Sequence, residues 1–167
     1  SSDVCSSDLD DFTGTTEVVA HAIEALGLQH DVEMQVCCTY PTSVLMNSKD
    51  LVDSLELFVN NDWQYVFAAA QPISSPLRSF KRSNSGEVEM FFPNYWPSRS
   101  QDLPECYVDA GFFYWANVGT WVRQDPIYKS HSTFVEIPDI RAVDINTESD
   151  WLQAELIFEL IRSGRIK

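Results

Sequence analysis

The sequence is poor in cations and has no long apolar run. Lysine and arginine total 11 residues against 25 aspartates and glutamates, which gives a formal net charge of −14. A surface this acidic repels nucleic acid backbones and anionic lipid, so we expect no nucleic acid and no membrane as partners. No apolar stretch reaches the roughly 18 residues that a membrane-spanning helix needs.

The cysteines are few and form none of the familiar metal or redox patterns. The sequence contains no CxxC pair and no Cys/His spacing typical of a zinc site. Cys37 and Cys38 are adjacent in an apolar run, which favours reduced thiols in a core over a disulfide framework. A GxSxG motif is also absent, so covalent catalysis has no support. We expect a cytoplasmic protein.

The first nine residues, Ser-Ser-Asp-Val-Cys-Ser-Ser-Asp-Leu, read like the in-frame translation of a sequencing adapter. A natural Ser/Asp-rich tail is the alternative. We therefore leave residues 1–9 out of the fold prediction. The remainder, residues 10–167, has the length of a single domain. With 44% hydrophobic and 13% aromatic residues, the chain is expected to be globular with a shaped pocket.

Apolar spacing predicts alternating helices and strands in the first half of the chain. Residues 17–26 form an amphipathic helix that Thr15 or Thr16 can cap, and Gly27 ends it. Residues 34–40 and 63–70 read as buried strands. Between them, the apolar stripe Leu51, Val52, Leu55, Phe58 and Val59 predicts a helix capped by Asn47 or Ser48. The β-α-β order with apolar strands favours a mostly parallel sheet covered by helices.

The second half is more irregular. Asn84-Ser-Gly86 predicts a hairpin turn, and the Pro- and Ser-rich residues 92–104 predict a loop. Residues 111–116 and 133–137 read as strands, and Thr147 with Asp150 as a capping box that starts the last helix. In open α/β sheets, ligands bind beyond the carboxyl ends of the strands. The loops that follow Tyr40, Ala70 and Val143 are therefore expected to line one cleft.

The segment Asp144-Ile-Asn-Thr147 is a candidate metal site at a predicted strand-to-helix junction. Mg²⁺ prefers carboxylate, water and phosphate oxygens, which makes Asp144 a candidate ligand. Asn146 offers an amide oxygen without charge. The alternative is structural: Asp144 ends a strand and Thr147 caps a helix.

Arg99, Gln101 and Asp102 stand in the predicted loop just before the strand at 111–116. An arginine fork matches a carboxylate at two points, so Arg99 is a candidate for binding an acidic ligand. The alternative is a surface loop that is salt-bridged to its acidic surroundings.

Together, Arg99 through Trp115 and Ala142 through Trp151 resemble the sugar-acid cytidylyltransferases. Arg99 through Pro104 fits that family's pattern of an Arg followed closely by Gln and Leu-Pro. In the family, the motif at Asp144 is usually Asp-Ile-Asp-Thr and binds the catalytic Mg²⁺, so Asn146 is a departure that puts the ligand set in doubt. The form Asp109-Ala-Gly111 is similar to that of the members acting on pseudaminic acid.

The resemblance assigns further roles. Asp109 and Tyr114 become candidates for sugar hydroxyl or acetamido contacts, with core packing as the alternative for the neighbouring aromatics. Three more segments are similar to the family: one at the cytidine pocket with Thr13 and Thr15, a Pro-Thr-Ser turn facing the sugar with Thr42 and Ser43, and a pseudaminic-type segment with Arg78. A plain helix cap explains Thr15 equally well.

The implied fold is a Rossmann-like α/β nucleotidyltransferase fold with a mostly parallel sheet, of which residues 10–167 are the C-terminal portion. The implied reaction joins CMP from CTP to a nonulosonic acid, with Mg²⁺ as cofactor and pseudaminic acid as the expected sugar. The family's Gly/Ser-Lys-Arg loop, which grips the triphosphate, does not occur in the chain. We therefore expect that loop upstream and no activity from these residues alone. A homodimer is a further expectation. The alternatives are an enzyme acting on sialic or legionaminic acid, and a non-catalytic protein that binds a sugar acid.

Overall fold

The computed structural model describes residues 14–166. The predicted adapter segment and Thr13 lie outside these residues. The helices and strands, in chain order, are α1 (Thr15–Ala25), β1 (Gln35–Thr39), α2 (Ser48–Val59), β2 (Tyr65–Ala70), β3 (Phe80–Arg82), β4 (Val88–Met90), β5 (Val108–Asn117), α3 (Val118–Val122), β6 (Ser132–Glu136) and α4 (Glu148–Arg162). Short 3₁₀ turns lie at Pro76–Arg78, Pro93–Tyr95, Ser100–Asp102 and Asp139–Arg141.

A four-stranded sheet of order β1-β5-β2-β6 forms the centre of the fold. The β2–β6 pair is parallel, whereas β5 runs antiparallel to both β1 and β2. Strands β1, β2 and β6 therefore share one direction and β5 is reversed between two of them. The predicted α/β class is confirmed, with a mixed sheet in which one central strand opposes the other three.

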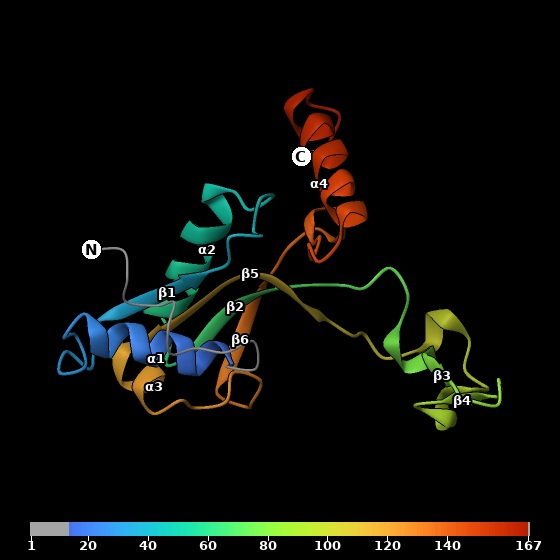
Figure 1. Cartoon of the computed structure of the whole chain (residues 1–167), viewed down its shortest axis with the longest axis horizontal. Coiled ribbons are helices and arrows are strands. Elements are labelled where there is room, and N and C mark those ends of the chain that lie inside the picture. The colour runs from blue at the N-terminus through green and yellow to red at the C-terminus, as the bar shows by residue number, and fades with distance from the viewer. Residues whose placement is uncertain (1–13, 167) are drawn as a thin grey trace.

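Helices cover both faces of the sheet, as Figure 1 shows. On one face, α1 and α3 bury Val19, Ile23 and Trp121 against apolar side chains of β2 and β5. On the other face, Phe58 of α2 stacks on Trp115 of β5 with ring centroids 6.5 Å apart. The same face carries a second core cluster that includes residues of β2, β5 and α4. Burial on two faces explains why all six residues of β2 are buried and why its sequence is continuously apolar.

Residues 71–107 form an arm that extends away from the sheet (Figure 1). The arm carries the predicted hairpin, in which β3 and β4 pair antiparallel around Gly86 at φ 92°. Several large apolar side chains of the arm are exposed, namely Ile73, Phe80, Val88, Phe91, Phe92 and Trp96.

The predicted caps are confirmed for two helices and wrong for one. Asn47 caps α2 by accepting a hydrogen bond from the Asp50 amide at 2.9 Å, and Thr147 with Asp150 forms the capping box of α4. The N-cap of α1 is Gly14, so neither Thr15 nor Thr16 caps it. Instead, the Glu17 carboxylate reaches back to the Gly14 amide at 3.3 Å.

The predicted strand ending at Asp144 is also wrong. Strand β6 ends at Glu136, and the following amide of Ile137 makes one more bond, to the Ala69 carbonyl at 2.7 Å. Pro138 then lacks the amide hydrogen needed to continue the ladder. A 3₁₀ turn at Asp139–Arg141 carries the chain toward Asp144, which lies in irregular structure before α4.

Cys37, Cys38 and Cys106 are free thiols, as predicted. Within residues 14–166, no helix combines the length and apolar character that a membrane crossing requires.

Candidate functional site

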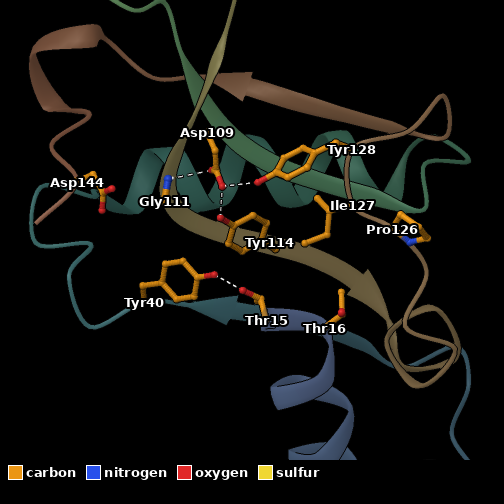
Figure 2. A pocket seen from close by; sticks show the side chains of 10 residues that line it. All are labelled: Thr15, Thr16, Tyr40, Asp109, Gly111, Tyr114, Pro126, Ile127, Tyr128 and Asp144. Atoms are coloured by element: carbon orange, nitrogen blue, oxygen red, sulfur yellow. Dashed lines mark hydrogen bonds between the residues drawn. The ribbon is translucent and has the colours of Figure 1, made fainter. Parts of the chain in front are cut away.

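A pocket of about 400 Å³ lies where the start of α1 meets the carboxyl end of β1 and the first half of β5. Its position agrees with the rule that ligands bind at the carboxyl ends of parallel strands. Figure 2 shows the side chains that line it, which come from five separate stretches of the chain: Thr15, Thr16, Tyr40, Asp109, Gly111, Tyr114, Pro126, Ile127, Tyr128 and Asp144.

The start of α1 and the end of β1 are joined by a hydroxyl contact. Thr15, the first residue of α1, hydrogen-bonds through Oγ1 to the hydroxyl of Tyr40, which directly follows β1 (Figure 2). The Tyr40 ring in turn packs on Tyr114 of β5 with centroids 5.6 Å apart. Contacts among three elements therefore hold one wall of the pocket in place. The nucleotide-binding role of Thr15 remains a prediction.

A bulge of several residues in β5 forms the opposite wall. Phe67 of β2 pairs with Tyr114, but Ala69, two residues on, pairs with Asp109, so β5 inserts extra residues between these pairs. Gly111 sits inside the bulge at φ 64°, a conformation that glycine adopts without a steric penalty. The Ser43 hydroxyl lies 3.1 and 2.9 Å from the carbonyl oxygens of Gly111 and Phe112. Ser43 therefore braces the bulge from outside and does not line the pocket.

The carboxylate of Asp109 accepts three hydrogen bonds within the bulge. Its Oδ1 accepts the Gly111 amide at 2.9 Å. Its Oδ2 accepts the hydroxyls of Tyr114 and Tyr128, the latter at 2.6 Å (Figure 2). Burial, followed by the hydrogen bond to Asp109, raises the pKa of both Tyr114 and Tyr128. Both phenols therefore stay protonated at neutral pH.

Asp144 lies at the edge of the same pocket with an exposed side chain. Three residues earlier, Arg141 is buried and bonds Asp50 of α2 through both terminal nitrogens, at 2.6 and 2.9 Å. Arg141 also donates to the Leu45 carbonyl at 3.1 Å. This anchor connects the segment before Asp144 to the N-terminus of α2.

Asn146 does not join Asp144 in this pocket. It lines a separate surface hollow with Ile145, Thr147, Glu148 and Trp151. Its backbone amide takes part in the start of α4, where Asp150 accepts from it at 3.0 Å and from the Thr147 hydroxyl at 2.8 Å. These contacts, with the Thr147 hydroxyl foremost, lower the pKa of Asp150. The proposed metal role of Asn146 remains a prediction.

The remaining predicted ligands are not among the residues that line the pocket. Arg78, Arg99, Gln101 and Asp102 all belong to the arm. Arg78 donates there to the Ser100 hydroxyl at 3.3 Å. Thr42 lies exposed in the turn after β1, two residues beyond Tyr40. Their assignments to the sugar also remain predictions.

The sequence prediction missed the stretch Pro126, Ile127 and Tyr128, which forms one side of the pocket. The Asp-Pro pair before Ile127 marks a turn, but no periodicity shows that the following aromatic points back at the sheet. It also missed Arg141 and Asp50, which are separated by 91 positions and carry no shared motif.

Comparison with known proteins agrees with the resemblance that the sequence motifs indicated. The chain is 35% identical over 151 residues to the pseudaminic acid cytidylyltransferase of Campylobacter jejuni subsp. jejuni serotype O:2, an alignment that covers 90% of this chain and 65% of that protein. The counterpart from serotype O:23/36 is 34% identical with the same coverage. No protein-family profile matches the chain.

A longer protein of Helicobacter pylori is also similar. It is named pseudaminic acid cytidylyltransferase and UDP-2,4-diacetamido-2,4,6-trideoxy-beta-L-altropyranose hydrolase, and it is 34% identical over 137 residues, which are 81% of this chain and 26% of that protein. The chain thus spans a little under two thirds of the two Campylobacter relatives and a smaller share of the third. The resemblance found in the sequence is confirmed: over nine tenths of its length, this chain is similar to two proteins that are named pseudaminic acid cytidylyltransferase.

Proposed function

We propose that this chain forms the sugar-acid side of a cytidylyltransferase that transfers CMP from CTP to a nonulosonic acid, with pseudaminic acid as the preferred substrate. One observation carries the proposal. Residues from three motifs that are far apart in the sequence line one pocket of about 400 Å³. These residues are Thr15, Asp109 with Tyr114, and Asp144. A pocket of that volume suits a small-molecule ligand.

In this reaction the protein mainly aligns the two reactants and neutralises the phosphate charge. The anomeric hydroxyl oxygen of the sugar acid bonds to the α-phosphorus of CTP, the bond from that phosphorus to the β-phosphate oxygen breaks, and pyrophosphate leaves as the hydroxyl loses its proton. In-line displacements of this kind depend on positioned reactants and stabilised phosphate charge. We assign nucleotide contacts to Thr15 at the start of α1 and sugar contacts to the wall around Asp109.

Asp144 is the residue that fits a magnesium ion. Within residues 14–166, no three Asp, Glu, His or Cys side chains cluster in a way that holds a metal. Mg²⁺ does not require such a cluster, because it commonly binds one or two carboxylates together with substrate phosphates and water. An exposed carboxylate at the edge of the pocket supplies one such ligand. When bound, the ion would withdraw charge from the CTP phosphates.

The triphosphate itself is assigned to residues that this sequence does not contain. Among the described residues, the lining of the pocket includes no Lys or Arg. The Campylobacter relatives are longer than the part that this chain matches. We propose that a Gly/Ser-rich loop with Lys and Arg, belonging to the unmatched part, cradles the phosphates.

A homodimer would account for the position of Arg99 and Arg78. Both lie in the arm rather than among the residues that line the pocket, and the arm exposes Phe80, Phe91 and Trp96. Exposed apolar side chains next to cations favour docking on a second, acidic copy of the chain. We propose that the arm of one copy reaches the other and supplies its arginines to the sugar carboxylate there.

The test is a titration of the ¹⁵N-labelled chain with pseudaminic, sialic and legionaminic acids, followed by amide chemical shifts. The proposal predicts that pseudaminic acid gives the largest shifts, clustered at Asp109, Gly111 and Tyr128. A preference for sialic acid would reassign the substrate and keep the pocket. Shifts confined to other surfaces, or none, would remove the proposed site.

The reaction itself is tested with the chain extended upstream by its own reading frame. That longer protein is expected to convert CTP and pseudaminic acid to CMP-sugar and pyrophosphate, and residues 10–167 alone are expected not to. Turnover by the shorter chain would show that the phosphate site lies within it.

A further inference from the structure

Tyr65 is a fully buried phenol that does not line the pocket. It is the first residue of β2, and the other residues of that strand are all apolar. Its ring meets the Trp121 ring of α3 edge-on, with centroids 5.1 Å apart. A phenylalanine would fill the same space, so the packing alone does not account for the hydroxyl group. A buried tyrosine hydroxyl usually has a specific hydrogen-bond partner.

The partner of the Tyr65 hydroxyl lies in the loop after α3. The hydroxyl donates to the backbone carbonyl of Asp125 at 3.0 Å. This carbonyl directly precedes Pro126, Ile127 and Tyr128, which line one side of the pocket (Figure 2). The bond therefore fixes the loop at the point where it reaches the pocket.

The same face of β2 also contacts the far end of this stretch. Tyr65 and Phe67 are two positions apart, and alternate residues of a strand point to the same side. Both belong to the core cluster on the side of α1 and α3. The Phe67 ring meets the Tyr128 ring edge-on, with centroids 5.4 Å apart. One face of β2 thus holds the loop at both Asp125 and Tyr128.

The turn that leads from α3 into this loop is strained. Gln124 has φ 54°, a left-handed conformation that costs a residue with a side chain about 1–2 kcal/mol. Such a conformation persists only where the surrounding contacts determine it. The Asp125 carboxylate accepts two hydrogen bonds from Arg123, at 3.0 and 2.8 Å, but the Arg123 side chain is 57% exposed and an exposed pair contributes little. The Tyr65 hydroxyl is the buried side-chain contact that holds the turn.

We propose that Tyr65 is a positioning residue whose hydroxyl holds the loop after α3, so that Ile127 and Tyr128 already stand in the pocket before a ligand binds. This inference rests on the proposed function, since the ligand of the pocket is there a sugar acid. A loop that is held in advance loses little freedom on binding, which favours affinity. Tyr65 acts through the loop and does not touch the ligand.

The experiment removes the hydroxyl and keeps the ring. Tyr65→Phe retains the packing on Trp121 and deletes only the bond to the Asp125 carbonyl. Calorimetry of the full chain with pseudaminic acid should show binding that is weaker by about three- to tenfold, the equivalent of one neutral hydrogen bond.

Amide chemical shifts of the chain without ligand give a second readout. In Tyr65→Phe the amide signals of Ile127 and Tyr128 should move. The signal of Gly111 should move with them, because the Gly111 amide and the Tyr128 hydroxyl both donate to Asp109. A hydroxyl that only stabilised the core would lower the free energy of unfolding in urea and leave these signals in place.

Two matched variants separate the hydroxyl from other contacts. Asp125→Asn keeps the backbone carbonyl and neutralises only the exposed pair with Arg123, so its effect on binding should be smaller than that of Tyr65→Phe. Tyr107→Phe removes another phenol hydroxyl, which contacts Gln71 at 3.4 Å outside the pocket lining, and it should leave binding unchanged.

The unaltered chain provides a check that depends on no variant. A buried hydroxyl hydrogen that is hydrogen-bonded exchanges slowly with water, so the Tyr65 hydroxyl should give a proton signal with nuclear Overhauser contacts to Asp125 and Pro126. The absence of this signal, or contacts with other residues instead, would overturn the proposed anchor.

The outcomes distinguish this inference from the proposed function. If the unaltered chain binds no sugar acid, the proposed function fails, while the amide signals of the loop still test the anchor. If the unaltered chain binds and Tyr65→Phe binds equally well, or if Asp125→Asn has the larger effect, Tyr65 has no positioning role. Weaker binding by a folded Tyr65→Phe variant, together with shifted loop signals, supports it.

Discussion

Arg141 and Asp50 form a buried, two-point ion pair that connects the turn before Asp144 to the first turn of α2. The Nη1–Oδ2 and Nη2–Oδ1 distances are 2.6 and 2.9 Å, and the side chains are only 6% and 9% exposed. Neither residue lines the pocket, so we expect the pair to position Asp144 without contacting a ligand.

Breaking this pair should strongly destabilise the fold. Arg141→Met leaves the Asp50 carboxylate buried without its partner, at a cost of about 3–5 kcal/mol. The double variant with Asp50→Asn removes that charge and should recover part of the loss. Urea unfolding of the four proteins of this cycle measures the coupling. Arg162→Met, which breaks an exposed pair with Glu159, is the control and should change stability by less than about 1 kcal/mol. Similar losses for both arginines would contradict the structural role.

Gly111→Ala should lower stability by about 1–2 kcal/mol through backbone strain alone. The residue has φ 64°, but a Cβ there would lie 3.9 Å from the nearest heavy atom, on Tyr40, so no steric clash is added. Gly111→Asn should cost less, since Asn tolerates the left-handed region. Thermal unfolding of both variants checks the order, and equal losses would point to packing instead of strain.

Stability should fall as pH rises above about 9. Burial raises the pKa of Cys37 from 9.0 to about 12 and that of Tyr65 from 10.0 to about 12. At pH values between the ordinary pKa and the raised pKa of each group, the unfolded chain loses a proton that the folded chain retains. The free energy of unfolding therefore decreases as pH rises. Urea midpoints from pH 8 to 11 measure the slope. Cys37→Ala and Tyr65→Phe should each flatten it, and an unchanged slope in both would assign the loss to other groups.

Asp144→Ala should sharply lower the Mg²⁺-dependent rate of the protein extended upstream, with the fold intact. Asn146→Asp should retain activity or shift its metal dependence, because it adds a carboxylate in the family's usual position. The matched control is Asp139→Ala, an exposed aspartate of the preceding 3₁₀ turn that does not line the pocket. The measurement is the reaction rate of each variant across a range of Mg²⁺ concentrations. A rate that Asp144→Ala leaves unchanged would make this residue structural.

Arg99→Ala should weaken sugar use about ten- to a hundredfold, the loss of one charged hydrogen bond. If the arm serves a second copy, mixing Arg99→Ala with Asp144→Ala should restore part of the activity, because one site of each mixed dimer carries neither change. Arg82→Ala, another arginine of the arm, is the control. Absence of recovery in mixtures shown to exchange subunits would confine Arg99 to its own copy.

Local signals in the sequence predicted most elements and two of the three caps, since capping boxes and apolar periodicity act within a few residues. The direction of β5 was not predictable, because it depends on pairing with β1 and β2, far away in the chain. Helix α3 is five residues long, too short for a period to show. The pocket motifs at Asp109 and Asp144 were found, whereas Tyr128 was missed because its role depends on a fold in which a loop crosses over Phe67.

The arm leaves and re-enters the sheet between two residues that face each other, Ala70 of β2 and Val108 of β5. In topological terms, residues 71–107 are thus an oversized hairpin connection between neighbouring strands. The entropy of closing such a connection grows only slowly with its length. A change in the length of the arm can therefore leave the register of both strands, and with it the pocket, unaltered.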